Sequence, residues 1–343
     1  MNKSIINQKI HLENKSILIT GGTGSFGKSL IEEITKNHNP KRLVIFSRDE
    51  QKQYAMAQKY KIQDFPYLRF FLGDIRDQDR LDMALSGIDI VIHAAAMKIV
   101  TSAEYNPFEC IRTNVIGAEN LVTSCINKNV KKVIALSTDK AVNPINLYGA
   151  SKLAADKIFV AANNLSQRKT NFAVVRYGNV IGSRGSIIPN FLKIAKDKNL
   201  NIPLTDPQMT RFWISIEDGV KFVLNSLNTM IGGEIFIPKI PSMKLIDVAK
   251  TLAPRNKINI IGIRPGEKLH EIMISKDDAR NTFELTDRYV VLPSISFGET
   301  YQEYKNKTKV SENFEYKSET NKTWLTQSAL KKIIKETSLT NIS

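Results

Sequence analysis

From residue 16 to residue 180, short apolar segments alternate with segments of helical length, and this alternation constrains the fold more than any other feature. The apolar segments are nearly continuous runs of Ile, Val, Leu and Phe, at residues 16–20, 42–47, 68–74, 88–96, 130–138 and 171–180. Such runs are typical of strands that are covered on both faces. The stretches between them predict helices, so we expect an α/β fold with a Rossmann-like doubly wound parallel sheet.

The pattern loosens after residue 180, where loops, short strands and helices mix. Residues 232–238 (GGEIFIP) predict a further strand that rejoins the sheet, and the rest predicts a smaller C-terminal substrate-binding lobe. Residues 300–322 are polar and charged, which is typical of a surface strap. The expected division is an N-terminal arm (1–15), a dinucleotide-binding Rossmann domain (16–180, with a return segment at about 215–240), and a substrate-binding lobe with a C-terminal strap (181–214 and 241–343).

The charge and the cysteine content of the 343 residues exclude several classes of protein. The net charge is +15, but the basic residues form no arginine-rich stripe, so we expect an anionic small-molecule ligand and no nucleic-acid partner. Cys110 and Cys125 form no CxxC pair, so we expect no metal site, no disulfide framework and a reducing, cytoplasmic location. No apolar run approaches ~20 residues, and the N-terminal segment lacks an apolar stretch, so we expect no membrane span and no signal peptide.

A glycine-rich turn lies between the first predicted strand and the first predicted helix. The segment ITGGTGSFG (19–27) contains Gly21, Gly24 and Gly27. Gly21 suits a tight turn, Gly24 lets the backbone approach a pyrophosphate, and Gly27 lets helix and strand pack closely. The helix N-terminus then faces the phosphates, because its free N–H groups and its dipole favour anions. In this context the glycines predict a dinucleotide site rather than only a tight turn.

The ends of the second and third strands indicate which dinucleotide binds. Ser47 and Arg48 suit a 2′-phosphate and favour NADP, whereas Asp49 and Glu50 are also compatible with NAD. Asp74 ends the third strand, where its carboxylate can accept a hydrogen bond from the adenine amino group, cap the next helix, or do both.

Tyr148 and Lys152 lie four residues apart at the start of a predicted helix, so their side chains share one face. The ammonium of Lys152 and a positive nicotinamide ring would both favour the phenolate. Such a tyrosine can remove a hydroxyl proton while the cofactor takes hydride from the same carbon.

Asp139 and Lys140 follow the fifth strand, at the edge of the sheet where ligands bind in this fold. A loop ion pair is the simplest interpretation, although sequence neighbours do not usually face one another. An acid at this place can protonate a leaving hydroxyl, and an amine can remove a carbon-bound proton. Spacing alone leaves both interpretations open.

These motifs resemble those of the extended short-chain dehydrogenases/reductases that act on nucleotide sugars. That resemblance rests on TGGTGSFG (20–27), NVIG (114–117) and YxxxK (148–152). A denser set resembles the inverting UDP-N-acetylglucosamine 4,6-dehydratases of pseudaminic acid synthesis: FSRDE (46–50), HAAAMK (93–98), AEYNPFECIRTN (103–114), STDKAVNPINLYGASK (137–152), RYGNVIGSRGS (176–186), MTRFW (209–213), GGEIFIPKIPSMK (232–244) and RPGEKLHE (264–271). Lys140 separates this group from the retaining 4,6-dehydratases, which have glutamate at that place.

The resemblance implies a dehydration that inverts C5, with NADP tightly bound and regenerated in every turnover. Tyr148, helped by Lys152, removes the C4 hydroxyl proton, and hydride passes from C4 to the cofactor and later to C6. Lys140 removes the C5 proton, and Asp139 protonates the leaving C6 hydroxyl. The implied substrate is UDP-N-acetylglucosamine and the product UDP-2-acetamido-2,6-dideoxy-β-L-arabino-hex-4-ulose. The resemblance also implies a homo-oligomer, often a hexamer.

The resemblance assigns binding residues as well. The expected cofactor-binding residues are Gly21, Thr23, Gly24, Ser25, Phe26, Gly27, Ser47, Arg48, Asp49, Glu50, Lys52, Asp74, Ile75, Ala94, Ala95, Lys98, Thr113, Tyr148 and Lys152. The expected substrate-binding residues are Lys98, Thr138, Asn179, Ile187, Thr205, Arg211, Arg264 and Glu267. Guanidinium groups bind a diphosphate bidentately, which suits both arginines, and an ion pair is their alternative role. We expect structural roles for His93, Trp213, His270 and the two cysteines.

Two alternatives remain beside the inverting dehydratase. Within the same fold, the chain could be a retaining UDP-sugar 4,6-dehydratase or a UDP-sugar 4-epimerase. Outside the enzymes, it could be an NADP-binding regulatory protein, but the complete set of Asp139, Lys140, Tyr148 and Lys152 argues against that.

Overall fold

The computed structural model describes residues 10–295 and 301–337. Of the segments expected above, residues 1–9 of the arm and residues 296–300 and 338–343 of the C-terminal part lie outside this description. Within the described part of the arm, Leu12 is buried against the main hydrophobic core.

A sheet of ten strands forms the centre of the described chain. Its spatial order is β16 (Thr308–Lys309), β14 (Thr282–Glu284), β15 (Arg288–Val291), β10 (Ile235–Pro238), β6 (Asn171–Tyr177), β5 (Lys132–Thr138), β4 (Ile90–His93), β1 (Ser16–Thr20), β2 (Arg42–Ser47) and β3 (Leu68–Leu72). All neighbours from β10 to β3 are parallel, and β15, β14 and β16 extend the sheet antiparallel. The order β3-β2-β1-β4-β5-β6 is that of a doubly wound dinucleotide-binding sheet, so the predicted fold class is confirmed.

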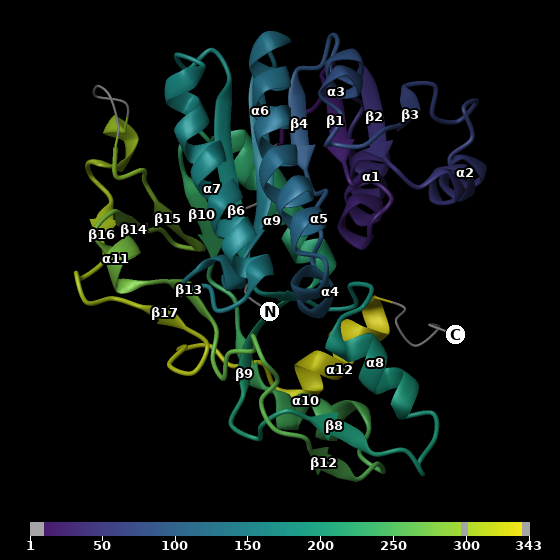
Figure 1. Cartoon of the computed structure of the whole chain (residues 1–343), viewed down its shortest axis with the longest axis vertical. Coiled ribbons are helices and arrows are strands. Elements are labelled where there is room, and N and C mark those ends of the chain that lie inside the picture. Colours follow the sequence, from purple (N-terminus) through teal and green to yellow (C-terminus); the bar gives the residue numbers. More distant parts are fainter. Residues whose placement is uncertain (1–9, 296–300, 338–343) are drawn as a thin grey trace.

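Helices cover both faces of the sheet (Figure 1). On one face α3 (Gln78–Ala84), α6 (Gly117–Asn127) and α7 (Leu147–Leu165) pack side by side. On the other face α1 (Ser25–Asn37) packs against α9 (Ile216–Thr229), and α2 (Glu50–Lys59) lies beside the edge strand β3. Because the central strands are buried on both faces, their sequences lack polar alternation.

The chain beyond β6 also builds a smaller body, drawn in the lower part of Figure 1. It contains a three-stranded sheet of β7 (Asn179–Val180), β9 (Thr210–Ile214) and β11 (Ser242–Lys244), a parallel pair of β8 (Ile202–Leu204) and β12 (Ile258–Ile260), and the helices α8 (Ile187–Ile194), α10 (Leu245–Leu252) and α12 (Gln327–Glu336). Its hydrophobic core, around Phe191, Trp213 and Val248, is separate from that of the central sheet.

The stretch between β4 and β5 does not form one regular helix: it is interrupted at Asn106 and again by a π-helical turn. The chain forms α4 (Val100–Tyr105), α5 (Pro107–Ile111), a π-helical turn (Arg112–Ile116) and then α6. Pro107 begins α5 because a proline fits the first turn of a helix but not its interior. The π-helical turn contains Asn114, whose amide bonds the backbone N–H of Met97 at 2.8 Å and its carbonyl at 3.0 Å. The loop after β4 is therefore fixed by this helix.

The polar segment at residues 300–322 is more than a surface strap. Its described part forms a 3-10 turn (Gln302–Tyr304), β16 and β17 (Tyr316–Lys317), which pairs with β13 (Ile272–Ile274). Tyr304 and Tyr316 are buried, and the Tyr316 ring centroid lies 4.8 Å from that of Phe212. Two tyrosines thus anchor this segment in the core, which its average polarity did not indicate.

Candidate active site

Two adjoining cavities, of about 980 and about 780 Å³, lie at the carboxyl ends of the parallel strands. The first follows the glycine-rich turn and the ends of β2, β4 and β5, and the second is lined mainly by the smaller body. Lys140, Asn179, Arg264 and Glu267 line both cavities and mark where they meet. In open α/β sheets ligands bind at this edge, where the strand order reverses.

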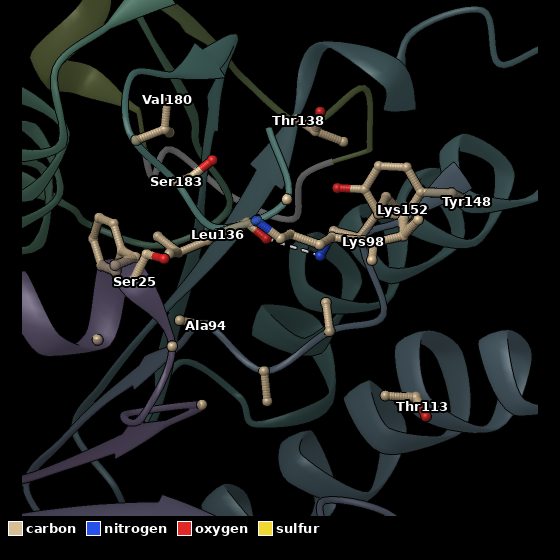
Figure 2. Close-up of a pocket in the computed structure, with 18 of the residues that line it drawn as sticks. Ser25, Ala94, Lys98, Thr113, Leu136, Thr138, Tyr148, Lys152, Val180 and Ser183 are labelled. Carbon is tan, nitrogen blue, oxygen red and sulfur yellow. Dashed lines mark hydrogen bonds between the residues drawn. The ribbon is translucent and has the colours of Figure 1, made fainter. Parts of the chain in front are cut away.

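The first cavity gathers most of the residues predicted for the cofactor. Its wall includes Gly21, Thr23, Gly24, Ser25, Phe26, Gly27, Ser47, Arg48, Asp49, Lys52, Ile75, Ala94, Ala95, Lys98, Thr113, Tyr148 and Lys152. Figure 2 shows Thr138, Tyr148 and Lys152 grouped on one side of this pocket and Ser25 of the glycine-rich turn on the other. Glu50 and Asp74, although described, are not part of the wall.

The glycine-rich turn fits a dinucleotide. Gly21 has a φ of +67°, and a Cβ built on it would lie 2.8 Å from the backbone nitrogen of Ala95. Helix α1 begins at Ser25 without a side-chain cap, so its first N–H groups remain available to an anion. The Thr113 hydroxyl, which is buried on the same wall, has no hydrogen-bond partner among the described residues. A diphosphate and a ribose would satisfy these groups.

The residues at the ends of β2 and β3 are paired with one another. Asp49 caps α2 by accepting from the backbone N–H of Lys52 at 2.9 Å, and it also pairs with the Lys52 ammonium. The Asp74 carboxylate lies 2.7 Å from Arg76 and 3.5 Å from Arg48. The helix-cap alternative for Asp74 is wrong, because helix α3 begins four residues later, at Gln78, and is capped by Asp77.

Helix α7 presents Tyr148 and Lys152 to the first cavity. It begins after Asn146, whose side chain accepts from the backbone N–H of Gly149 at 2.7 Å. The Lys152 ammonium donates to the Leu136 carbonyl at 2.8 Å, the bond drawn as a dashed line in Figure 2. Burial raises the pKa of Tyr148 to about 12, and Lys140 and the Thr138 hydroxyl oppose this rise. Lys140 is therefore a cation that favours the phenolate in this structure, a role that the sequence interpretation gave to Lys152 alone.

Asp139 and Lys140 face one another, contrary to the expectation for sequence neighbours. A single 3-10 turn (Asp139–Ala141) after β5 brings Lys140 Nζ to 3.0 Å from Asp139 Oδ1. Lys140 lines both cavities, but Asp139 is completely buried and, in the described structure, forms no part of either wall. Asp139 therefore reaches the cavity through Lys140 or through the Thr138 hydroxyl, which donates to it at 3.0 Å.

The second cavity gathers the residues predicted for the substrate. Its wall includes Asn179, Ile187, Thr205, Arg211, Arg264 and Glu267, while Lys98 and Thr138 line the first cavity. Arg264 is half-exposed and lies 3.1 Å from Glu267. The Lys98 ammonium donates to the Arg184 carbonyl at 2.7 Å, so it ties the loop after β7 to the loop after β4.

Arg211 is engaged differently from Arg264. Its guanidinium donates to the carbonyls of Thr210 at 2.7 Å, Lys268 at 2.9 Å and Leu269 at 3.1 Å, and its Nε lies 3.6 Å from Glu271. These contacts make the ion-pair alternative the better description of Arg211 in this structure. A diphosphate would have to compete with the protein for its N–H groups.

The sequence interpretation missed Glu271. Its carboxylate lies 3.2 Å from Lys140 Nζ and lines the second cavity. Burial raises its pKa, but Lys140, Arg211 and Lys268 together lower the pKa below its usual range. The available signal was the motif RPGEKLHE, which ends at Glu271. No strand or helix pattern in the sequence places Glu271 opposite the end of β5. Its contact with Lys140 could therefore not be predicted from the sequence.

The remaining candidates are part of the packed interior. His93 is buried, its Nδ1 lies 2.8 Å from the Thr20 hydroxyl, and burial lowers its pKa to about 3. Cys110 and Cys125 are both buried thiols, and Trp213 lies in the core of the smaller body. Among the described residues, no three His, Cys, Asp or Glu side chains are grouped to hold a metal ion. None of the described helices is both long and apolar enough to cross a membrane.

Comparison with known proteins agrees with this geometry. A family model described as "Polysaccharide biosynthesis protein" matches residues 17–293. The chain belongs to this family. A curated relative from Campylobacter jejuni subsp. jejuni serotype O:2, a UDP-N-acetylglucosamine 4,6-dehydratase (inverting), is 53% identical over 330 residues, covering 94% of this chain and 98% of the relative. The resemblance drawn from the sequence motifs is thus confirmed. Another relative, a UDP-glucose 4-epimerase from Rickettsia akari, is 44% identical over 80% of this chain and 82% of its own length.

Solved structures show the same fold. The X-ray structure of Pen from Bacillus thuringiensis is 34% identical, covers 96% of this chain and 100% of its own, and has a TM-score of 0.87. DesIV from Streptomyces venezuelae, a dTDP-glucose 4,6-dehydratase solved with NAD and TYD bound, has a TM-score of 0.67 over 74% of this chain and 86% of its own. At 21% identity that second likeness concerns the fold alone.

Proposed function

We propose that this chain is an inverting UDP-N-acetylglucosamine 4,6-dehydratase that forms UDP-2-acetamido-2,6-dideoxy-β-L-arabino-hex-4-ulose. One observation carries the proposal: Lys140, paired with Asp139, lies where the cavity lined by the glycine-rich turn meets the second cavity, on the same wall as Tyr148. A plain dehydrogenase or epimerase needs only the tyrosine and its lysine. The identity of 53% to an inverting dehydratase over 94% of the chain supports the same conclusion.

A nicotinamide dinucleotide is the cofactor that the first cavity fits, and when bound it supplies a hydride acceptor that is also a hydride donor. Gly21, Gly24 and the start of α1 would hold its diphosphate. We propose NADP over NAD, because Arg48 is more than half exposed beside the cavity while Asp49 already accepts hydrogen bonds from Lys52. A tightly held cofactor suits a reaction in which every hydride is returned.

Tyr148 acts as the base for the sugar C4 hydroxyl. Burial holds its pKa at about 12, so it needs positive charge nearby to lose its proton, and Lys140 provides it. Lys152 keeps the helix in place by its bond to Leu136 and lies on the same wall. Thr138 lies between Tyr148 and Asp139 and can pass a proton from one to the other.

Lys140 and Asp139 carry out the elimination. Once C4 is a ketone, the C5 hydrogen is acidic, and Lys140 is the amine that reaches the cavity to remove it. Its ammonium, which favours the Tyr148 phenolate in the first step, must first release a proton to solvent, and the neutral amine then takes the C5 proton. Burial raises the pKa of Asp139, which keeps it a proton donor near neutral pH. Its proton leaves for the C6 hydroxyl through Lys140 or Thr138, since Asp139 itself is closed off from both cavities.

The second cavity would receive the uridine diphosphate. Arg264 is the better diphosphate ligand of the two predicted arginines, because its guanidinium is half-exposed and lines both cavities. Glu267 and Asn179 line the same junction and suit the ribose hydroxyls. Arg211 would support the site from behind by holding the chain at Lys268 and Leu269.

We further propose a division into a dinucleotide-binding unit and a substrate lobe, supported by the two separate hydrophobic cores. The strands β14, β15 and β16, which the boundaries given above assign to the lobe, join the central sheet instead. Exposed Tyr105, Phe108 and Ile116 on α4, α5 and the π-helical turn support a homo-oligomer that covers this surface. The two free buried thiols suit a reducing compartment such as the cytoplasm.

An NMR time course of the purified protein with UDP-N-acetylglucosamine tests the function. We expect a new C6 methyl signal and a 4-keto product with L-configured C5, with solvent deuterium incorporated at C5. A D-configured keto sugar would instead indicate a retaining dehydratase. UDP-N-acetylgalactosamine without a methyl signal would indicate an epimerase, the activity named for the Rickettsia relative.

A further inference from the structure

Two carboxylates share the single ammonium of Lys140, and only one of them was expected from the sequence. Lys140 Nζ lies 3.0 Å from Asp139 and 3.2 Å from Glu271. Asp139 is adjacent in the chain, whereas Glu271 comes from the segment before β13. The site is therefore completed by a residue 131 positions away from Lys140 (271 minus 140).

The backbone of Glu271 is held from both sides. Its N–H donates to the Ser318 hydroxyl at 2.9 Å, and its carbonyl accepts from the Ser318 N–H at 2.9 Å. Arg211 holds the preceding carbonyls of Lys268 and Leu269. A side chain whose supporting backbone is fixed in this way can define the position of the group it contacts.

The two carboxylates have different surroundings. Glu271 lies near two cations, at 3.2 Å from Lys140 and 3.6 Å from Arg211, and Lys268 adds a third positive charge. Asp139 is completely buried and has a single cation in contact, Lys140 at 3.0 Å. Its Oδ1 also accepts from the Thr138 hydroxyl at 3.0 Å, and one oxygen of each carboxylate has no hydrogen-bond partner among the described residues. A buried ionised carboxylate beside one cation is more costly than one beside three, so the neutral acid is favoured at Asp139 and the anion at Glu271.

We propose that Glu271 is a positioning residue of the acid/base site: it holds the Lys140 amine on the cavity wall and, as the fixed anion of the cluster, leaves the proton with Asp139. This rests on the proposed function, and it assigns a part to a residue outside the Asp139–Lys140 and Tyr148–Lys152 motifs. Glu271 touches neither C5 nor C6 in this account and acts through Lys140.

The pKa shifts agree with this assignment. Burial raises the pKa of Asp139, and the negative charge of Glu271 raises it further. Burial alone would lower the pKa of Lys140, but Asp139 and Glu271 together raise it above its usual range. The other charged or titratable groups that face Lys140 are Arg211, Lys268 and Tyr148. Two carboxyl groups whose pKa values are driven apart are typical of an acid paired with a fixed anion.

The substitution Glu271→Gln keeps the volume and removes the charge. Loss of this anion lowers the pKa of both Lys140 and Asp139, so both limbs of the pH–rate profile for dehydration should move to lower pH by about one unit or more. Glu271→Asp keeps the charge and should leave the limbs near their wild-type positions, even if the rate falls. Glu234→Gln is the matched control, since Glu234 is also buried but accepts hydrogen bonds from Ile231 and Gly232, away from the cavities.

A profile of Glu271→Gln that keeps its wild-type limbs, with only a uniformly lower rate, would show a merely structural role and overturn the proposal. The proposal is also overturned if Glu234→Gln shifts both limbs of the pH–rate profile as far as Glu271→Gln does.

A measurement without turnover separates this inference from the proposed function. Infrared spectra of the full-length wild-type protein at neutral pH should contain the carbonyl band of a buried carboxylic acid that is absent from Asp139→Asn and weaker in Glu271→Gln. Identical bands in wild type and Asp139→Asn would overturn the inference, even if Glu271→Gln does not fold. If the wild type makes no keto sugar but the band behaves as expected, the proposed function fails and the assignment of the proton to Asp139 stands.

Discussion

Two clusters of buried charged residues lie at the carboxyl ends of β5 and β6. They differ in whether their unpartnered hydrogen-bonding atoms lie beside a cavity. The cavity cluster contains Asp139, Lys140, Arg211 and Glu271. The interior cluster contains Asp156, Arg176 and Asp278, the last from α11 (Lys276–Ala279). Both join the central sheet to a later segment, through Lys140–Glu271 at 3.2 Å and Arg176–Asp278 at 3.2 Å.

The interior cluster lines neither cavity, although the buried Arg176 Nε also lacks a hydrogen-bond partner among the described residues. Asp156 accepts from Ser137 at 2.8 Å and lies 3.5 Å from Arg176, which also donates to the Met273 carbonyl at 3.0 Å. In the cavity cluster, by contrast, one oxygen each of Asp139 and Glu271 lacks a partner among the described residues, and Lys140 lines two cavities. Burial and pairing are common to both clusters. Chemistry is indicated by unfilled hydrogen-bonding capacity beside a cavity.

The largest effect is expected in the cavity cluster, where a substitution should abolish most of the activity. Lys140→Ala should lower product formation about a thousandfold or more, because it removes the base for C5. A smaller amount of 4-keto hexose should still be trapped by borohydride, since Tyr148 remains but loses the positive charge of Lys140. The matched control is Lys132→Ala, which removes a partly buried lysine that donates to Leu227 away from the cavities. Full activity of Lys140→Ala, measured by NMR, would refute the assigned role.

The second largest effect is expected in the interior cluster, where a substitution should lower stability and not activity. Arg176→Met leaves Asp156 buried beside an apolar side chain, so the free energy of unfolding should fall by about 3–5 kcal/mol. The turnover number of the folded fraction should change little. Urea denaturation gives the first quantity and active-site titration the second. As a control, Lys36→Met breaks an exposed ion pair with Glu32 and should leave the free energy of unfolding nearly unchanged. A turnover number that falls more than the folded fraction would place Arg176 in the active site.

The third prediction concerns the pH dependence of stability that is caused by His93, a buried residue outside both clusters. Burial lowers the pKa of folded His93 from 6.5 to about 3, so the unfolded chain binds a proton first as the pH falls. The contribution of His93 to the free energy of unfolding is therefore fully present above pH 6.5. It is lost as the pH falls below 6.5, at about 1.4 kcal/mol per pH unit. Between pH 7 and pH 5 the wild type should lose about 2 kcal/mol more than His93→Gln, measured by urea denaturation. Equal losses would show that His93 is not the titrating group.

The smallest expected effect lies outside both clusters. Arg48→Ala should weaken NADP binding about tenfold and leave NAD binding nearly unchanged, since one exposed guanidinium on a phosphate contributes about 1–2 kcal/mol. Isothermal titration with each dinucleotide measures this, with the exposed Arg69→Ala as control. If both dinucleotides lose affinity equally, Arg48 does not select the 2′-phosphate.

The sequence by itself determined the parallel sheet, the glycine-rich turn and the Tyr148–Lys152 pair. These features are local: strand runs, turn glycines and helical spacing fix which residues meet within one β–α unit. The dehydratase motif with Lys140 was likewise readable, because Asp139 and Lys140 are adjacent. The buried tyrosines of residues 301–322 were not, since average polarity conceals two anchoring side chains.

Only the tertiary structure decided what surrounds Lys140. Glu271 and Arg211 reach it from segments with no periodic signal, and a 3-10 turn makes Asp139 face its own neighbour while closing it off from the cavity. Contacts between distant segments depend on how the smaller body packs on the sheet, and a pKa depends on that packing at the scale of single ångströms. Residue types and spacing therefore indicated which groups react, whereas the fold decided which of them holds the proton.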